Sequence, residues 1–202
     1  MENLKSVLAD VNVDDHVRII AQKIEFSGPI FTIYDDDIEF RSGDRARRQY
    51  MDHHDAVAIV ALRNTDSEPE ILLIRQYRHA ARRIFWEIPA GLCDHPGEDR
   101  LIAAQRELAE ETDMRAEHWE SLVSFYASPG CSNENLDVYL VTGVTSVTDR
   151  ENPAGSFERV EEEREIEMGW FALSEVLEAV QSGDLRSPTL VLGVLAASLR
   201  YK

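Results

Sequence analysis

Three glutamates that share one face of an expected helix are the residues of this chain best suited to chemistry. Glu107, Glu110 and Glu111 stand at positions i, i+3 and i+4, and side chains at those offsets project together. Like charges at this spacing repel, and the C-terminal end of a helix disfavours anions. A hard divalent cation would reverse both penalties, because Mg2+ binds through carboxylates and substrate phosphates. The alternative is a solvated acidic face, which is common in an acidic chain.

The residues around these glutamates predict a strand, a loop and a helix. The apolar stretch 85–88 breaks at Pro89-Ala90-Gly91. A loop through residues 94–97 follows, and a helix is expected to begin near Glu98. The helix has an apolar stripe at helical spacing, formed by Leu101, Ala104 and Leu108. The stripe would dock the helix and leave the three carboxylates beside it.

The stretch from Gly91 to Met114 resembles the Nudix hydrolase box, G-x5-E-x7-R-E-U-x-E-E-x-G-U with U aliphatic. Glu98 and the run 106–112 match in order. Six residues instead of five separate Gly91 from Glu98, and Asp113 replaces the last glycine. Asp tolerates the left-handed conformation that ends a helix better than most residues do. Neither departure removes a carboxylate, so the resemblance implies metal-assisted hydrolysis of a diphosphate linked to another group.

The resemblance also assigns roles to the polar residues of the box. The metal ligands that it implies are the backbone carbonyl of Ala90 and the carboxylates of Glu107, Glu111 and, as an auxiliary ligand or holder of metal-bound water, Glu110. Mg2+ is the expected ion, and Mn2+ is a substitute. Arg106 belongs to the catalytic set by pairing with Glu98, which fixes the loop to the helix.

A further carboxylate should act as general base or as an extra metal ligand. Glu162 and Glu163 are the candidates, because they lie in an acidic run shortly before Gly169-Trp170. Glu134 is the competing candidate, but in the relevant branch of the family such a residue contacts the substrate.

Segments outside the box are similar to the ADP-ribose pyrophosphatase branch of the family. They are W86-E-I-P-A-G91, S128-P-G-C-S-N-E134 and W170-F-A-L-S-E-V176. The substrate-binding residues that this similarity implies are Arg78, Arg48, Glu134 and Glu87. The implied reaction converts ADP-ribose to AMP and ribose 5-phosphate.

Three alternatives remain at this point. The substrate could be another nucleoside diphosphate sugar or a nucleoside triphosphate. The chain could be a non-catalytic ADP-ribose sensor, although a sensor has no need for the full carboxylate set. An acidic interaction domain would explain the composition but not the spacing.

Composition limits the partners and the setting. A net charge of −17 over 202 residues argues against nucleic acid and against anionic membrane surfaces, since both are held by clustered Lys and Arg. No apolar run reaches the length of a membrane span, and the first residues lack a signal-peptide core. Cys93 and Cys131 form no metal-binding pair. We expect a cytoplasmic protein, and the resemblance implies that its partner is a small nucleoside diphosphate sugar.

The periodicity predicts strands, a helix, more strands and two final helices, which is a mixed sheet of the α/β or α+β class. Residues 1–54 form an expected N-terminal β region, and 55–202 the expected Nudix domain, a sheet sandwiched between helices. Strands 56–62 and 70–77 should pair as a hairpin, and Asp35 to Asp37 should form a turn. Ser174 should cap one late helix, Gly183 should end it, and Pro188 should open the next. The resemblance implies a homodimer in which the β region is exchanged and helps to bind adenine.

Overall fold

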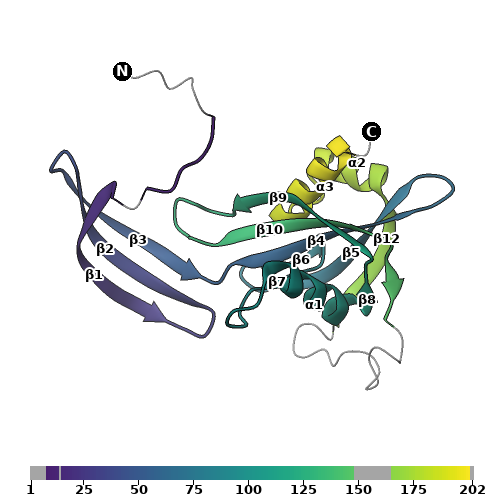
Figure 1. The fold of residues 1–202 in the computed structure, drawn as a ribbon, viewed down its shortest axis with the longest axis horizontal. Helices are drawn as coiled ribbons and strands as arrows, with labels where there is room; N and C mark the ends of the chain where they lie inside the picture. Colours follow the sequence, from purple (N-terminus) through teal and green to yellow (C-terminus); the bar gives the residue numbers. More distant parts are fainter. Residues whose placement is uncertain (1–7, 14, 148–164, 201–202) are drawn as a thin grey trace. The chain divides into compact units, whose positions relative to one another are not determined.

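The structure is a computed structural model that describes residues 8–13, 15–147 and 165–200. The chain divides into two compact units. The N-terminal unit comprises Met1–His53 with Gly130–Asn133, and the main unit comprises His54–Pro129 with Glu134–Lys202. Figure 1 shows the order of the elements along the chain.

The main unit is a mixed sheet with helices on both faces, which confirms the expected fold class. Within the described residues, seven strands join in the order β12-β5-β4-β10-β9, with β6 on β5 and β7 on β4. The strands are β4 (Ala56–Asn64), β5 (Pro69–Arg78), β6 (Arg83–Glu87), β7 (Ala90–Leu92), β9 (His118–Tyr126), β10 (Asn135–Thr142) and β12 (Glu167–Ala172). Two short strands, β8 (Met114–Arg115) and β11 (Thr145–Ser146), pair separately. The helices are α1 (Arg100–Thr112), α2 (Leu173–Ser182) and α3 (Pro188–Arg200).

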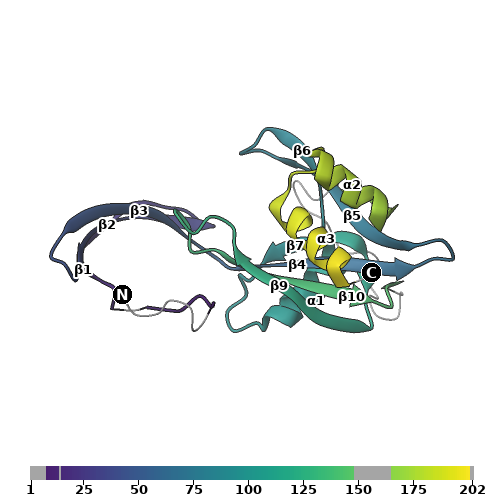
Figure 2. The same cartoon turned by 90° about the horizontal axis from the view of Figure 1, so that it is seen from above.

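Strand β4 explains why the sheet is covered on both faces. Its residues Ala56 to Leu62 are all buried, as expected for a strand between two layers. Alternate side chains enter two different cores. Val57, Ile59 and Ala61 pack with α1 residues, whereas Ala58, Val60 and Leu62 pack with residues of α2 and α3. Figures 1 and 2 show α1 and the α2–α3 pair on opposite sides of these strands.

The predicted hairpin and the later helices are largely as expected. Strands β4 and β5 pair antiparallel, with Leu62 opposite Ile71. Gly183 ends α2 at φ 80° and Pro188 opens α3. The predicted Ser174 cap is wrong, because strand β12 runs directly into α2 and the helix begins at Leu173 without a side-chain cap. No helix in the described ranges is both long enough and apolar enough to cross a bilayer.

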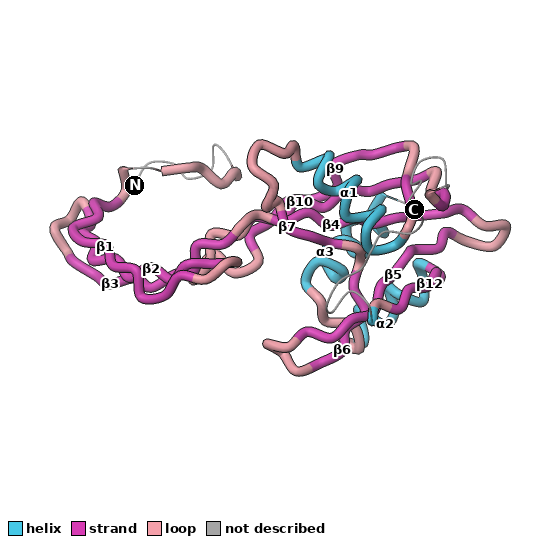
Figure 3. The backbone as a smooth tube through the Cα atoms, turned by 90° about the horizontal axis from the view of Figure 1, so that it is seen from below, coloured by secondary structure: helices cyan, strands magenta, loops and turns pink. Residues whose placement is uncertain are grey.

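The N-terminal unit contains three antiparallel strands in its described part, in the order β1-β2-β3. They are β1 (Val17–Ser27), β2 (Phe31–Phe40) and β3 (Arg45–His53). The register of β1 shifts at two places along β2. Such bulges bend a strand, and Figure 3 shows the bend in this sheet.

The predicted turn at Asp35 to Asp37 is wrong, because β2 continues through it. Asp35 is buried and accepts hydrogen bonds from Arg47 and Gln49 on β3, with distances of 2.6 Å from Arg47 Nε to Oδ1 and 2.7 Å from Gln49 Nε2 to Oδ2. The pKa of Asp35 is lowered to about 2, mainly by the hydrogen bond from Arg47. These partners from the next strand stabilise an extended conformation that the aspartate run alone does not favour.

Candidate active site

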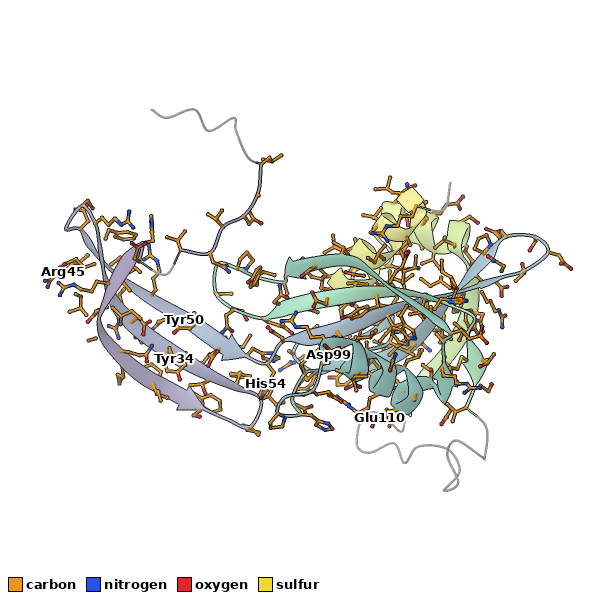
Figure 4. The ribbon with its side chains drawn as sticks, viewed as in Figure 1. Tyr34, Arg45, Tyr50, His54, Asp99 and Glu110 are labelled. Atoms are coloured by element: carbon orange, nitrogen blue, oxygen red, sulfur yellow. The ribbon has the colours of Figure 1, made fainter. Side chains whose placement is uncertain are left out.

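The helix that carries the candidate ligands begins at Arg100, two residues after the expected start at Glu98. Asp99 is extended, and its side chain accepts the backbone N–H of Leu101 at 2.8 Å. This is a standard N-cap, which satisfies one of the donors left open at a helix start. Figure 4 shows Asp99 at the start of α1 and Glu110 farther along the helix.

The helix ends where the box departs from its family pattern. Asp113 is left-handed at φ 54°, and its N–H donates to Ala109 O at 2.8 Å. The carbonyl of Asp113 accepts the N–H of Val147 at 2.9 Å. The prediction that Asp113 serves in place of glycine is therefore confirmed.

Arg106 joins the loop, the helix and the carboxylates. Its Nη2 donates to Glu98 Oε2 at 3.1 Å and to the carbonyl of Leu92 at 3.3 Å. Its Nη1 donates to Glu107 Oε1 at 2.6 Å and to Glu110 Oε2 at 3.0 Å. Burial by itself would lower the pKa of Arg106. The hydrogen bonds and charges of these glutamates outweigh that effect, so the pKa is raised. The predicted pairing of Glu98 with Arg106 is confirmed.

Glu107 lies against the bare Cα of Gly91. A Cβ added at Gly91 would stand 1.9 Å from Glu107 Cδ and 2.2 Å from each carboxylate oxygen. Burial raises the pKa of Glu107, and Arg106 opposes that shift. Glycine is therefore needed here to make room for the carboxylate.

Glu111 is held by the backbone of β7. Its side chain is buried, and Oε2 accepts the N–H of Ala90 at 2.9 Å. Strand β7 is itself paired with β4, with Ala90 opposite Ala58. The central sheet thus fixes both Glu111 and the residue whose carbonyl is the expected third ligand.

These donors fit a hard divalent cation. The donor atoms are carboxylate oxygens, which are ligands that suit Mg2+. The side chains of Glu107 and Glu111 are more than half buried. The box contributes several glutamates and a single guanidinium to this cluster, which therefore carries excess negative charge. Within the described residues no group of three or more His, Cys, Asp or Glu side chains is already arranged around one point. The Ala90 carbonyl stays the predicted third ligand.

A second buried network lies where β5 and β6 pair. Glu87 is buried and accepts hydrogen bonds from Gln76 Nε2 at 3.1 Å and from Arg78 Nη2 at 2.6 Å. The turn 79–82 joins these strands, and the basic stretch 78–83 includes it and the paired residues Arg78 and Arg83. Two of the predicted substrate-binding residues, Arg78 and Glu87, are thus bound to each other.

The other predicted residues are placed separately. Arg48 is exposed on β3 of the N-terminal unit and donates to the carbonyl of Arg47 at 3.0 Å. Glu134 is half-buried and directly precedes β10 in the main unit. Glu162 and Glu163 lie outside the described residues.

The sequence interpretation missed a polar and aromatic group in the N-terminal unit. Tyr34 and Tyr50 stack across β2 and β3, with ring centroids 5.5 Å apart and planes 25° apart, and both are labelled in Figure 4. Asp36 is buried on β2, and among the described residues its Oδ1 is a buried oxygen without a hydrogen-bond partner. Burial and the charge of Asp36 raise the pKa of Tyr50. Alternation along a strand places Tyr34 and Asp36 on one face. This was missed because Asp35 to Asp37 were predicted to form a turn and not a strand.

A Nudix box on a mixed sheet between helices defines the class of this protein. The family model of the NUDIX domain matches residues 52–189. The chain belongs to the Nudix hydrolase family, whose members generally use divalent metal cations, and it is an enzyme of that family.

Comparisons with individual proteins add detail. The chain is 36% identical over 177 residues to an ADP-ribose pyrophosphatase of Mycobacterium tuberculosis, which covers 88% of this chain and 81% of that protein. It is 32% identical over 181 residues to a methanol dehydrogenase activator of Bacillus methanolicus, covering 88% and 92%. Its fold is similar to the crystal structure of an ADP compounds hydrolase, with a TM-score of 0.75, 20% identity and coverage of 91% and 93%.

Proposed function

We propose that this enzyme hydrolyses the pyrophosphate bond of ADP-ribose to AMP and ribose 5-phosphate with Mg2+. The observation that carries the proposal is the arrangement of Glu107 against Gly91 and of Glu111 on the Ala90 N–H. The similarity to an ADP-ribose pyrophosphatase supports the choice of substrate.

The box residues have distinct parts in this proposal. Glu107, Glu111 and the carbonyl of Ala90 would hold the ion, and Glu110 would assist them. When bound, Mg2+ neutralises the pyrophosphate and lowers the pKa of an attacking water. Arg106 holds Glu107 and Glu110 in orientation through its hydrogen bonds. Glu162 or Glu163 accepts the proton of the water.

Arg78 binds the substrate phosphates in this proposal, and Glu87 orients it. A guanidinium presents five donors in a planar fork, so it can hold a carboxylate and a phosphate together. The buried position of Glu87 and its second bond from Gln76 fix the orientation of the fork. Glu134 and Arg48 are assigned to the remaining substrate contacts.

The N-terminal unit binds the adenine in this proposal. The stacked Tyr34 and Tyr50 offer an aromatic surface on which a base can stack. Apolar side chains of β1 such as Ile19, Ile24 and Phe26 are about half exposed. Their exposure supports a homodimer, in which a second copy would cover them. We place the enzyme in the cytoplasm.

The test is Mg2+-dependent release of AMP from ADP-ribose, measured beside ADP-glucose, NADH, GDP-mannose and nucleoside triphosphates. Glu111→Gln is the blank. Selective turnover of ADP-ribose supports the proposal. If the enzyme prefers another compound of the panel, the proposed substrate is wrong, but metal-assisted hydrolysis of a diphosphate by the box residues still stands. Binding of ADP-ribose without any turnover favours a sensor.

A further inference from the structure

The first residue of α1 has a charge that the helix itself disfavours. Arg100 stands at the N-terminal end, where the helix dipole is positive and cations are unfavourable, and the first turn contains no acidic residue. Its side chain is 34% exposed, so water does not fully solvate it. An arginine here needs partners from outside the helix.

Those partners come from the starts of two central strands. Arg100 Nη1 donates to Asp137 Oδ2 at 2.7 Å and to Asn135 Oδ1 at 2.7 Å, both on β10. Arg100 Nη2 donates to Asp55 Oδ2 directly before β4. One guanidinium therefore ties the catalytic helix to both parallel strands in the middle of the sheet. Burial opposes its charge, but the two aspartates raise the pKa of Arg100.

Asp55 holds both ends of the box loop. Its carbonyl accepts the N–H of Cys93 at 2.8 Å, at the start of the loop. Its carboxylate accepts Arg100, at the end of the loop. The second carboxylate oxygen accepts the N–H of Asn135 at 3.0 Å, so the carboxylate cannot rotate without losing a bond. Between these anchors lies the loop that has one residue more than the family pattern.

We propose that Arg100 is a positioning residue of this active site, which fixes the start of α1 and the loop 93–99 through its bridge to Asp55. The loop carries Glu98, and Glu98 receives Arg106. Arg106 in turn donates to Glu107. Displacement at Arg100 is therefore transmitted to a candidate metal ligand through two consecutive hydrogen-bonded pairs.

The geometry of the bridge requires an arginine. A planar fork reaches two carboxylates at once, whereas a lysine ammonium is a point charge on a flexible stem. Arg100→Lys should keep the charge balance and much of the stability. It should not hold Asp55 and Asp137 in their present positions.

The experiment compares Arg100→Met, Arg100→Lys and Asp55→Asn with the full-length enzyme, each assayed well below its Tm. We expect kcat to fall by about 10- to 100-fold, the range seen when groups that orient metal ligands are removed, with KM changed only slightly. Hydrogen exchange of the peptide 93–100 should become faster in all three variants. Arg100→Lys should keep a Tm closer to wild type than Arg100→Met, yet lose similar kcat.

Arg63→Met is the matched control. Arg63 is also a partly exposed arginine of the main unit, paired with Glu70 at 2.6 Å and stacked over Trp170 at 4.3 Å, but it has no bond to the box loop. Its loss should lower Tm and leave kcat unchanged. Wild-type kcat in both Arg100→Met and Asp55→Asn would overturn the inference, as would lost kcat with unchanged exchange in 93–100.

The inference rests on the proposed function only for its activity readout, and the two can fail separately. If Arg100→Met does not fold, Asp55→Asn decides, since asparagine keeps the shape and removes the charge. If the wild-type enzyme does not hydrolyse ADP-ribose, the substrate proposal fails. The exchange of 93–100 in Asp55→Asn, compared with Arg63→Met, then still tests the bridge.

Discussion

Replacing Gly91 by alanine tests the placement of the proposed metal ligand Glu107 most directly. The new Cβ would lie 1.9 Å from Glu107 Cδ, whereas ordinary contact begins at 3.4 Å. The carboxyl group must therefore move by about 1.5 Å, the difference between those distances. Gly91 is not among the glycines with positive φ, so alanine can adopt its backbone conformation. The flexible end of Glu107 will yield before the backbone of β7 does.

The expected result is a loss of activity with little loss of stability. A misplacement of about 1 Å can cost about 100-fold in rate, which corresponds to about 2.7 kcal/mol of transition-state stabilisation. We therefore expect Gly91→Ala to lower kcat/KM about 100-fold and to raise the Mg2+ concentration for half-maximal activity. The free energy of unfolding should change by no more than about 1 kcal/mol, the usual scale for glycine-to-alanine changes at compatible positions.

Steady-state kinetics across a Mg2+ titration, with thermal melts alongside, measure both effects. The same substitution in a Glu107→Gln background should have almost no further effect, because changes that act through one group are not additive. Wild-type kinetics in Gly91→Ala would refute the contact between Gly91 and Glu107. A full 100-fold loss in both backgrounds would show that the added methyl group acts on something else.

Three further substitutions test other parts of the site and the fold. Glu111→Gln should lower kcat by about 100-fold or more, since a metal contributes several kcal/mol of charge stabilisation. The variant should still fold, because the amide oxygen of the substituted side chain can accept the Ala90 N–H. Near-normal turnover would remove Glu111 from the ligand set. Arg78→Ala should mainly raise KM for ADP-ribose, and an effect on Tm alone would contradict a phosphate contact. Asp35 has a pKa of about 2 in the fold and about 3.9 in an unfolded chain, so its stabilising contribution is complete above about pH 4 and is lost as the pH falls toward 2. Arg47→Met should raise the pKa of Asp35, followed by NMR titration of labelled carboxylates, and should move acid unfolding to higher pH; an unchanged pKa would mean that Arg47 is not the main cause.

The site could be predicted from the sequence where its geometry is local. Helical periodicity alone places Glu107, Glu110 and Glu111 on one face, and the fixed spacing of the box pairs Glu98 with Arg106. The left-handed end of α1 could be predicted as well, because Asp113 occupies the position where the chain must turn. Each of these inferences depends on residues within about three helical turns of one another.

The sequence interpretation failed where the deciding partner is distant in the chain. Three consecutive aspartates favour a turn locally, but Arg47 and Gln49 on the next strand make the extended form stable. No local sequence pattern indicated the role of Arg100, because its hydrogen-bond partners lie 35 to 45 residues away in the chain. The contact of Glu107 with Gly91 was equally hidden, since it exists only after β7 has paired with β4.

Burial destabilises the anionic form of Glu107 and thereby favours a cation as its partner. Burial raises its pKa, so the carboxylate is less stable as an anion here than in water, and Arg106 offsets only part of that penalty. Arg106 already donates to Glu98 and Glu110, so its single positive charge is shared among three carboxylates. A divalent cation supplies the charge that the guanidinium lacks, and a pyrophosphate can then approach an otherwise anionic cluster. In an enzyme with a net charge of −17, the proposed metal site would allow an anionic substrate to bind at these glutamates.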